Sequence, residues 1–475
     1  MSDRLTIGYA GVAFASYYAE EHNQYGRARE YLTELAARMD VELVSYDSPI
    51  YEAHDAEAAA EMFIESDVDF LIVQNATCAS GETLLPLTRV TKRLGLWGTP
   101  DPQLEGQVEL HSLVSMNHFA SIVRRYLRDE GVEYKWFFGE PGNEQLTRRL
   151  EVTLNALRGL KKMRTSRIGW IGGLSPGFFN MEFDMALLKQ RFGTEVVALD
   201  MKQLMDRARA ADPADVKRTS QELSSAAKLV LVDSREMTQG AALVEGMRNL
   251  VAEMDFDALA VQCWPTFQDE YDVAPCMAYG WMGSEYNIPV GCEGDVLGTV
   301  SMLMMNGLQV TARPPTLLDL TAFSADMEAV LMWHCGVSPR TWANEDGVSW
   351  VPHTTLGRKS ENTYGVAGDM VFAAQPVTIS YLSGDASELL ILTADIVERP
   401  EKGFDGTRGW FTNFKLNNEA ISVEDLVNTL VVRGQQHHYA VASATLGSEL
   451  LEVAAWADLE VVTKVPYGDH MQRNK

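Results

Sequence analysis

The chain has 475 residues, of which 46% are hydrophobic and 22% are charged, and its formal net charge is -26. This length and composition indicate a folded protein of about two to four domains with sizeable cores. A strongly negative surface repels nucleic acid and anionic membranes, so we expect neither as a partner.

The first residues, MSDRLTIGYAGVAF, lack the basic and apolar regions of a secretory signal peptide. The longest apolar runs are too short to cross a membrane. The five cysteines are odd in number and show no zinc-ribbon or redox spacing, so we interpret them as small buried side chains. We therefore expect a cytoplasmic protein with reduced thiols.

The first third of the chain alternates predicted strands and helices. Strands are expected at 4–11, 41–47, 68–76 and 94–100, and helices at 25–39, 55–66 and 81–94. Continuous apolar strands between amphipathic helices are typical of a parallel sheet covered on both faces. A basic helical stretch at 143–166 follows, and we place an N-terminal α/β domain at 1–165.

The same pattern restarts after this helix. Strands are expected at 167–173, 194–200, 228–234 and 257–264, and helices at 183–192, 215–227 and 239–254. This predicts a second α/β domain at 166–305, which carries part of the active site. Its glycine-rich segment at 169–177 does not match the G-x-G-x-x-G pattern, so it is only a weak signal for a nucleotide.

Short predicted strands joined by Gly, Asp and Asn turns dominate the rest of the chain. They cover 376–384, 387–398, 409–416 and 439–444. The fold class predicted is therefore two Rossmann-like, doubly wound α/β domains followed by a β-rich, barrel-like domain at 306–475.

Polar residues end several of the predicted parallel strands, where ligands of open α/β sheets bind. Gln262 ends one strand, and Glu293 ends the strand before a long apolar helix. Asp295 is well placed to cap that helix, whereas Glu293 is not explained as a cap. Glu293 is therefore a candidate for holding a metal.

Three further positions could contribute to such a site. Asp319 lies between apolar pairs, and His437 and His438 begin a predicted strand or helix, so that one of the two faces inward. Two carboxylates and one imidazole suit a divalent ion such as Mn²⁺ or Mg²⁺. His334, next to Cys335, is more readily a structural or substrate-facing residue than part of a nucleophilic pair.

These segments together resemble the L-fucose isomerase family, in particular its shorter fucose/arabinose-isomerase-like members. The matching pieces run in order over nearly the whole chain: LWGTP, HSLVSMNHFA, RIGWIGGLSPGF, VQCWPTF, CEGDVLGTVSMLMM, TLLDLTAF, WHCGVSP, PVTISYL and QHHYAVA. The resemblance implies aldose–ketose isomerisation of a free fucose- or arabinose-like sugar through a cis-enediol. It also implies a homo-oligomer, either a trimer or a hexamer.

The resemblance also assigns roles to residues. It implies that Glu293, Asp319 and His438 hold Mn²⁺, with Mg²⁺ or Co²⁺ as alternatives, and that Glu293 and Asp319 also move protons. Gln262, Trp264 and His334 are expected to contact the sugar.

Other functions stay open. The arginine with which longer members contact substrate has no match near the N-terminus, so the resemblance does not specify the exact sugar. A sulfonated or phosphorylated hexose is an alternative substrate, which an Arg/Lys cluster in the pocket would support. A metal-dependent sugar hydrolase or aldolase could use the same three ligands, and a sugar-binding protein of the periplasmic type also has two α/β domains.

Overall fold

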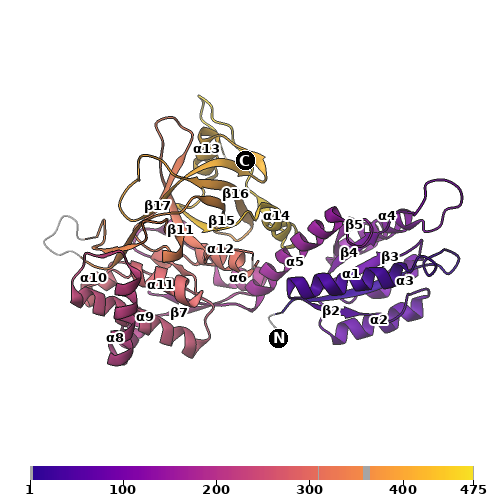
Figure 1. The fold of residues 1–475 in the computed structure, drawn as a ribbon, viewed down its shortest axis with the longest axis horizontal. Helices are drawn as coiled ribbons and strands as arrows, with labels where there is room; N and C mark the ends of the chain where they lie inside the picture. The colour runs from indigo at the N-terminus through magenta and orange to yellow at the C-terminus, as the bar shows by residue number, and fades with distance from the viewer. Residues whose placement is uncertain (1–3, 309, 357–363, 474–475) are drawn as a thin grey trace. The chain divides into compact units, whose positions relative to one another are not determined.

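A computed structural model describes residues 4–308, 310–356 and 364–473 (Figure 1). The chain forms two compact units, one of residues 1–158 and one of residues 159–475. Among the helices that these ranges contain, none is long and apolar enough to cross a membrane.

The first unit is built on a parallel sheet. Its strand order is β2-β1-β3-β4-β5, and the strands are β1 (Thr6–Val12), β2 (Glu42–Ser45), β3 (Phe70–Asn75), β4 (Arg93–Gly98) and β5 (Glu133–Phe138). The helices are α1 (Gln24–Met39), α2 (Ala53–Glu65), α3 (Gly81–Leu87) and α4 (Ser112–Ile122). Every residue of β1 and β3 is buried, as expected for central strands covered on both faces.

The second unit contains a smaller parallel sheet with the order β10-β9-β6-β7. Its strands are β6 (Arg167–Ile171), β7 (Glu195–Leu199), β9 (Ala258–Val261) and β10 (Val290–Gly291). The helices between and after them are α6 (Met185–Phe192), α7 (Met201–Arg209), α8 (Pro213–Ala226), α9 (Ser234–Met254), α10 (Thr266–Tyr271), α11 (Cys276–Tyr286) and α12 (Val296–Gly307). Helix α5 (Glu144–Thr165) carries the chain from the first unit into the second.

A closed antiparallel barrel forms the rest of the second unit. Its strands follow one another as β16 (Glu388–Val397), β15 (Gln375–Leu382), β19 (His438–Ala442), β11 (Thr316–Phe323), β12 (Val330–His334) and β17 (Thr407–Leu416). Pairing of β16 with β17 closes the ring. Helices α13 (Val423–Arg433) and α14 (Gly447–Trp456) lie in the same region of the chain. The chain thus combines parallel-sheet α/β regions with a C-terminal barrel, whereas the Rossmann-like description and the predicted boundaries at 165 and 305 stay predictions.

The predicted strand at 228–234 is wrong in its placement. Only Leu229–Val230 forms a strand, β8, and it pairs with β13 (Ser349–Val351) at the edge of the barrel sheet rather than with the smaller parallel sheet. Both of its residues are exposed. An apolar run indicates a strand, but it does not indicate which sheet the strand joins.

Helix α12 connects the smaller parallel sheet to the barrel. It is mostly apolar and contacts β9, β15 and β19, and all of its residues except Asn306 are buried. Its Ser301 hydroxyl accepts a hydrogen bond from the Leu382 backbone amide of β15, at 2.9 Å. The middle of α12 is therefore fixed next to the barrel strands.

Candidate metal and sugar site

The register of three barrel strands places the candidate ligands at one level. Asp319 of β11 lies directly opposite His438 of β19 and opposite Trp333 of β12. Residues directly opposite each other project from the same face of a sheet, so these side chains are neighbours. His438 Nε2 lies 3.6 Å from Asp319 Oδ1.

Glu293 reaches the same place from the end of the smaller sheet. Its Oε2 lies 3.4 Å from His438 Nε2 and 3.2 Å from His437 Nε2. The backbone of Glu293 has a φ of 59°, a left-handed conformation that is uncommon for a residue with a side chain. Such strain persists only where the surroundings enforce it, and it is concentrated at functional sites.

The chain on either side of Glu293 holds this conformation. Its carbonyl accepts a hydrogen bond from the Ser175 amide at 2.9 Å, and the Gly294 carbonyl accepts one from Trp170 Nε1 at 3.1 Å. A Cβ at Gly294 would come within 2.1 Å of the Gly173 carbonyl oxygen, so only glycine allows this close approach.

Asp295 has more than the expected capping role. One of its carboxylate oxygens accepts hydrogen bonds from the Gly298 amide and from the Tyr381 hydroxyl, both at 2.8 Å. The other lies 3.0 Å from His438 Nδ1. A carboxylate that accepts from one ring nitrogen leaves the other nitrogen free to bind a metal. Asp295 therefore caps α12, as the sequence predicts, and also orients His438, which the sequence did not indicate.

The two adjacent histidines are made different by their neighbours. Asn180 Nδ2 lies 3.0 Å from His437 Nδ1, and donation of this amide hydrogen places the His437 ring proton on Nε2. His437 therefore donates to Glu293, whereas His438 presents a lone pair. His437 also stacks on Phe178, with ring centroids 5.1 Å apart, and Phe178 packs edge-on against Trp264 at 6.2 Å.

His334 lies at the end of β12 and is buried. Its Nδ1 accepts the Cys335 backbone amide at 2.8 Å, and its Nε2 has no hydrogen-bond partner among the described residues. Ligand atoms of Asp319, His334 and His438 all lie within 4.8 Å of one another. Because Nδ1 is an acceptor, Nε2 carries a proton and is directed at this cluster as a donor.

The charges of the cluster perturb its acid–base properties. Burial raises the pKa of Asp319. Burial acts to lower the pKa of His334, whereas the charges of Cys335 and Asp319 act to raise it. Burial likewise opposes the charged form of His438, yet its contact with Asp295 raises the pKa. Close, mutually perturbed groups of this kind are typical of functional sites.

Gln262 is close to the site but its side chain is engaged. Its amide donates to the carbonyls of Gly172 and Leu174, both at 3.0 Å, and accepts from the Thr266 hydroxyl at 2.8 Å. Gln262 thus holds the loop after β6 in place. Its predicted contact with a sugar stays a prediction, as does that of Trp264.

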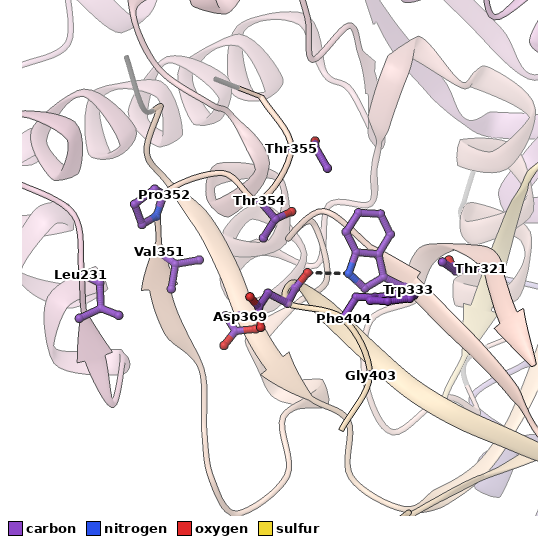
Figure 2. A pocket seen from close by; sticks show the side chains of 11 residues that line it. Leu231, Thr321, Trp333, Val351, Pro352, Thr354, Thr355, Asp369, Gly403 and Phe404 are labelled. Atoms are coloured by element: carbon purple, nitrogen blue, oxygen red, sulfur yellow. Dashed lines mark hydrogen bonds between the residues drawn. The ribbon is translucent and has the colours of Figure 1, made fainter. Parts of the chain in front are cut away.

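A cavity of about 780 Å³ is lined by Trp333, the cross-strand neighbour of Asp319, although none of the candidate metal ligands lines it (Figure 2). Trp333 projects from the same face as Asp319, and Thr321, which lies in a bulge of β11 two residues after Asp319, also lines the cavity. Trp333 Nε1 donates to the Asp405 carbonyl at 2.7 Å, the contact drawn as a dashed line in Figure 2. Other lining residues are Thr354, Thr355, Asp369 and Phe404. An aromatic ring among hydroxyl and carboxylate groups suits a polar ligand with several hydroxyls.

Comparisons with known proteins bear on what this site does. No family model matches the chain. The chain is 27% identical over 405 residues to a sulfoquinovose isomerase of Alkalicoccus urumqiensis, covering 84% of this chain and 87% of the relative. It is also 27% identical over 410 residues to sulfoquinovose isomerases of Priestia aryabhattai and Priestia megaterium, covering 84% of this chain and 85% of each relative.

The chain is an aldose–ketose isomerase. The expected enzyme class is thereby confirmed, and the hydrolase and aldolase alternatives are set aside. The similarity supports a sugar isomerase family related to L-fucose isomerase. A solved ABC transporter periplasmic solute-binding protein from Actinobacillus succinogenes with bound D-allose covers 56% of this chain and 81% of its own. It is 12% identical with a TM-score of 0.17, too low to support an argument.

Proposed function

We propose that the isomerase converts a sulfonated aldohexose of the sulfoquinovose type into the corresponding ketose, using a divalent cation held by Glu293, Asp319 and His438. The observation that carries the proposal is the convergence of these three side chains in an isomerase whose similar relatives act on sulfoquinovose. Free fucose- or arabinose-like sugars, the first expectation from sequence, fit these relatives less well.

The chemistry of the donor set fits a cation. Asp319 Oδ1 is buried and has no hydrogen-bond partner among the described residues, and a buried charged oxygen without a partner is costly. The His438 lone pair and the Glu293 carboxylate face the same point. Two carboxylates with one imidazole match the preferences of Mn²⁺, with Mg²⁺ and Co²⁺ as further candidates.

The cation, when bound, would polarise the sugar carbonyl and stabilise the negative charge that develops on its oxygen. Glu293 is the candidate base for the proton that moves between C2 and C1, because its carboxylate is partly exposed and held by the donor His437. Asp319 is the second candidate for this role. The route passes through a cis-enediol of the open-chain sugar.

His334 would donate a hydrogen bond to a reacting sugar oxygen. Its Nε2 proton is fixed by the Cys335 amide on the opposite side of the ring, and no described residue competes for it. A donor held in advance where charge develops stabilises the transition state more than it stabilises the substrate. The remaining sugar hydroxyls would lie along the cavity of Figure 2, toward Thr321 and Asp405.

A substrate comparison tests the proposal. The full-length protein with Mn²⁺ is incubated separately with sulfoquinovose, L-fucose and D-arabinose, and the products are followed by carbon NMR. We expect a ketose from sulfoquinovose without carbon–carbon cleavage, and loss of turnover in excess chelator with recovery on adding Mn²⁺. Preferred turnover of fucose, or turnover unaffected by chelator, would contradict the proposal. Assembly into a trimer or hexamer and a cytoplasmic location stay predictions.

A further inference from the structure

Four of the five cysteines gather behind the site although they are far apart in the sequence. They are Cys263, Cys276, Cys292 and Cys335, and all are free thiols. The sulfurs of Cys276 and Cys335 lie 3.9 Å apart. Cys292 Sγ, Cys335 Sγ and a ring nitrogen of His334 lie within 4.8 Å of one another. The fifth cysteine, Cys78, belongs to the other compact unit.

Cys335 differs from the rest of this thiol cluster. It is half-buried, whereas Cys276 and Cys292 are completely buried. Hydrogen bonds from the Cys276 and Cys292 thiols hold the pKa of Cys335 well below its usual range. Of these three thiols, Cys335 combines the least burial with thiolate character, which is the form that reacts with oxidants.

A metal is a poor occupant of this cluster. A ring nitrogen of His353 lies within 4.8 Å of the sulfurs of Cys276 and Cys335. However, His353 Nδ1 accepts the amides of Thr355 at 3.1 Å and Leu356 at 2.9 Å. These bonds use the Nδ1 lone pair and leave the proton on Nε2, so neither nitrogen can bind a metal. His334 Nδ1 is likewise used, by the Cys335 amide.

We propose that Cys335 and Cys276 are a modification site at which a hydroperoxide forms a disulfide that switches the isomerase off. The Cys335 thiolate attacks the terminal peroxide oxygen, forming an S–O bond and breaking the O–O bond, and the departing oxygen leaves as water or an alcohol. The Cys276 sulfur then attacks the Cys335 sulfenic acid and releases water. Two thiols lose two electrons, and the hydroperoxide is reduced by the same two.

The disulfide would act on catalysis through His334. Its sulfurs must close from 3.9 Å to about 2.05 Å. Cys335 also supplies the backbone amide that fixes His334 Nδ1, and Cys276 is the first residue of α11, so closure displaces one or both. A misplacement of about 1 Å at a catalytic group can cost roughly 10²-fold in rate.

The test treats the full-length protein with hydrogen peroxide and counts its thiols after denaturation. We expect the five free thiols to fall to three, with one cross-linked peptide joining Cys276 to Cys335. Isomerase turnover should fall roughly 10²-fold and return on adding a thiol reductant. The matched control, Cys78→Ser, should fall from four thiols to two and lose turnover to the same extent.

Several results would overturn the proposal. They are five unmodified thiols after treatment, a cross-link that uses Cys292 or Cys263 instead, or full turnover by the cross-linked protein. Cys276→Ser should form no Cys276–Cys335 cross-link, and Cys335 should instead be recovered as a sulfenic acid or a higher oxide. Peptide mapping of the unmutated protein decides the chemistry even if that variant fails to fold. The mapping also does not depend on which sugar is the substrate.

Discussion

The contacts of Asp295 allow its two roles to be separated by substitution. Asp295→Asn keeps one side-chain oxygen for the Gly298 amide and the Tyr381 hydroxyl, but it replaces the oxygen that accepts from His438 Nδ1 with an amide donor. Partners that orient a metal-bound histidine typically contribute 10–100-fold to metal affinity, or about 1.4–2.7 kcal/mol. We expect Asp295→Asn to lose Mn²⁺ affinity by this factor while remaining folded.

Asp295→Ala removes all three contacts. Loss of the helix cap costs about 1 kcal/mol, and the buried Tyr381 hydroxyl left without its partner costs about 1–3 kcal/mol. The expected loss in the free energy of unfolding is therefore about 2–4 kcal/mol, measured by urea unfolding in chelator.

The matched control for these substitutions is Asp212→Asn. Asp212 is exposed and caps α8 through the Ala214 amide at 2.7 Å. Titration calorimetry with Mn²⁺ should give wild-type affinity for Asp212→Asn. Wild-type Mn²⁺ affinity in Asp295→Asn would refute the argument that Asp295 orients His438.

Three further predictions follow from the same structure. Glu293→Gln with saturating Mn²⁺ should still bind a sugar alcohol but lose turnover by about 10²–10⁴-fold. The exposed control Glu345→Gln should keep wild-type turnover. Substantial turnover by Glu293→Gln would shift the base role to Asp319. Isomerisation in deuterated water should place deuterium at C1 of the ketose by NMR, because an enediol exchanges this hydrogen and a hydride shift does not. Hydrogen bonds from Ser324 and Arg399 lower the pKa of Asp326 to about 2. Asp326 therefore stabilises the fold above about pH 4 and loses this effect as the pH falls toward 2. Asp326→Asn should have a lower thermal midpoint than wild type at pH 7, and the two midpoints should converge in acid. A difference in midpoint that does not change with pH would contradict this.

The sequence predicted the features that depend on local pattern. Continuous apolar strands between amphipathic helices indicated the parallel sheets, and the position of Asp295 before an apolar helix indicated a cap. The choice between His437 and His438 depended on resemblance alone. In the structure, the two histidines differ because Asn180 contacts His437 and Asp295 contacts His438, and because the register between β11 and β19 places His438 opposite Asp319. Asn180 and Asp295 are both far from the histidines in sequence.

The pattern of apolar residues along the sequence did not predict which strands pair over long distances in the chain. The 228–234 run reads as a central strand, yet β8 lies exposed at the edge of the barrel sheet because its partner, β13, comes more than a hundred residues later. The thiol cluster was missed for the same reason, since Cys276 and Cys335 are 59 residues apart and have no motif spacing. The sequence indicated Glu293 as a candidate ligand because helix capping did not explain it. Its left-handed backbone conformation could not be predicted from the sequence.

The most direct test of the central claim is anomalous diffraction at the manganese edge from crystals soaked with Mn²⁺ and a sugar alcohol. We expect one strong peak within about 2.0–2.3 Å of Glu293, Asp319 and His438 Nε2, with two sugar oxygens completing the coordination. His437 should remain outside bonding distance and hydrogen-bonded to Glu293. A peak ligated by His437 instead of His438, or no peak at these side chains in crystals whose protein isomerises sugar, would contradict the proposed metal site.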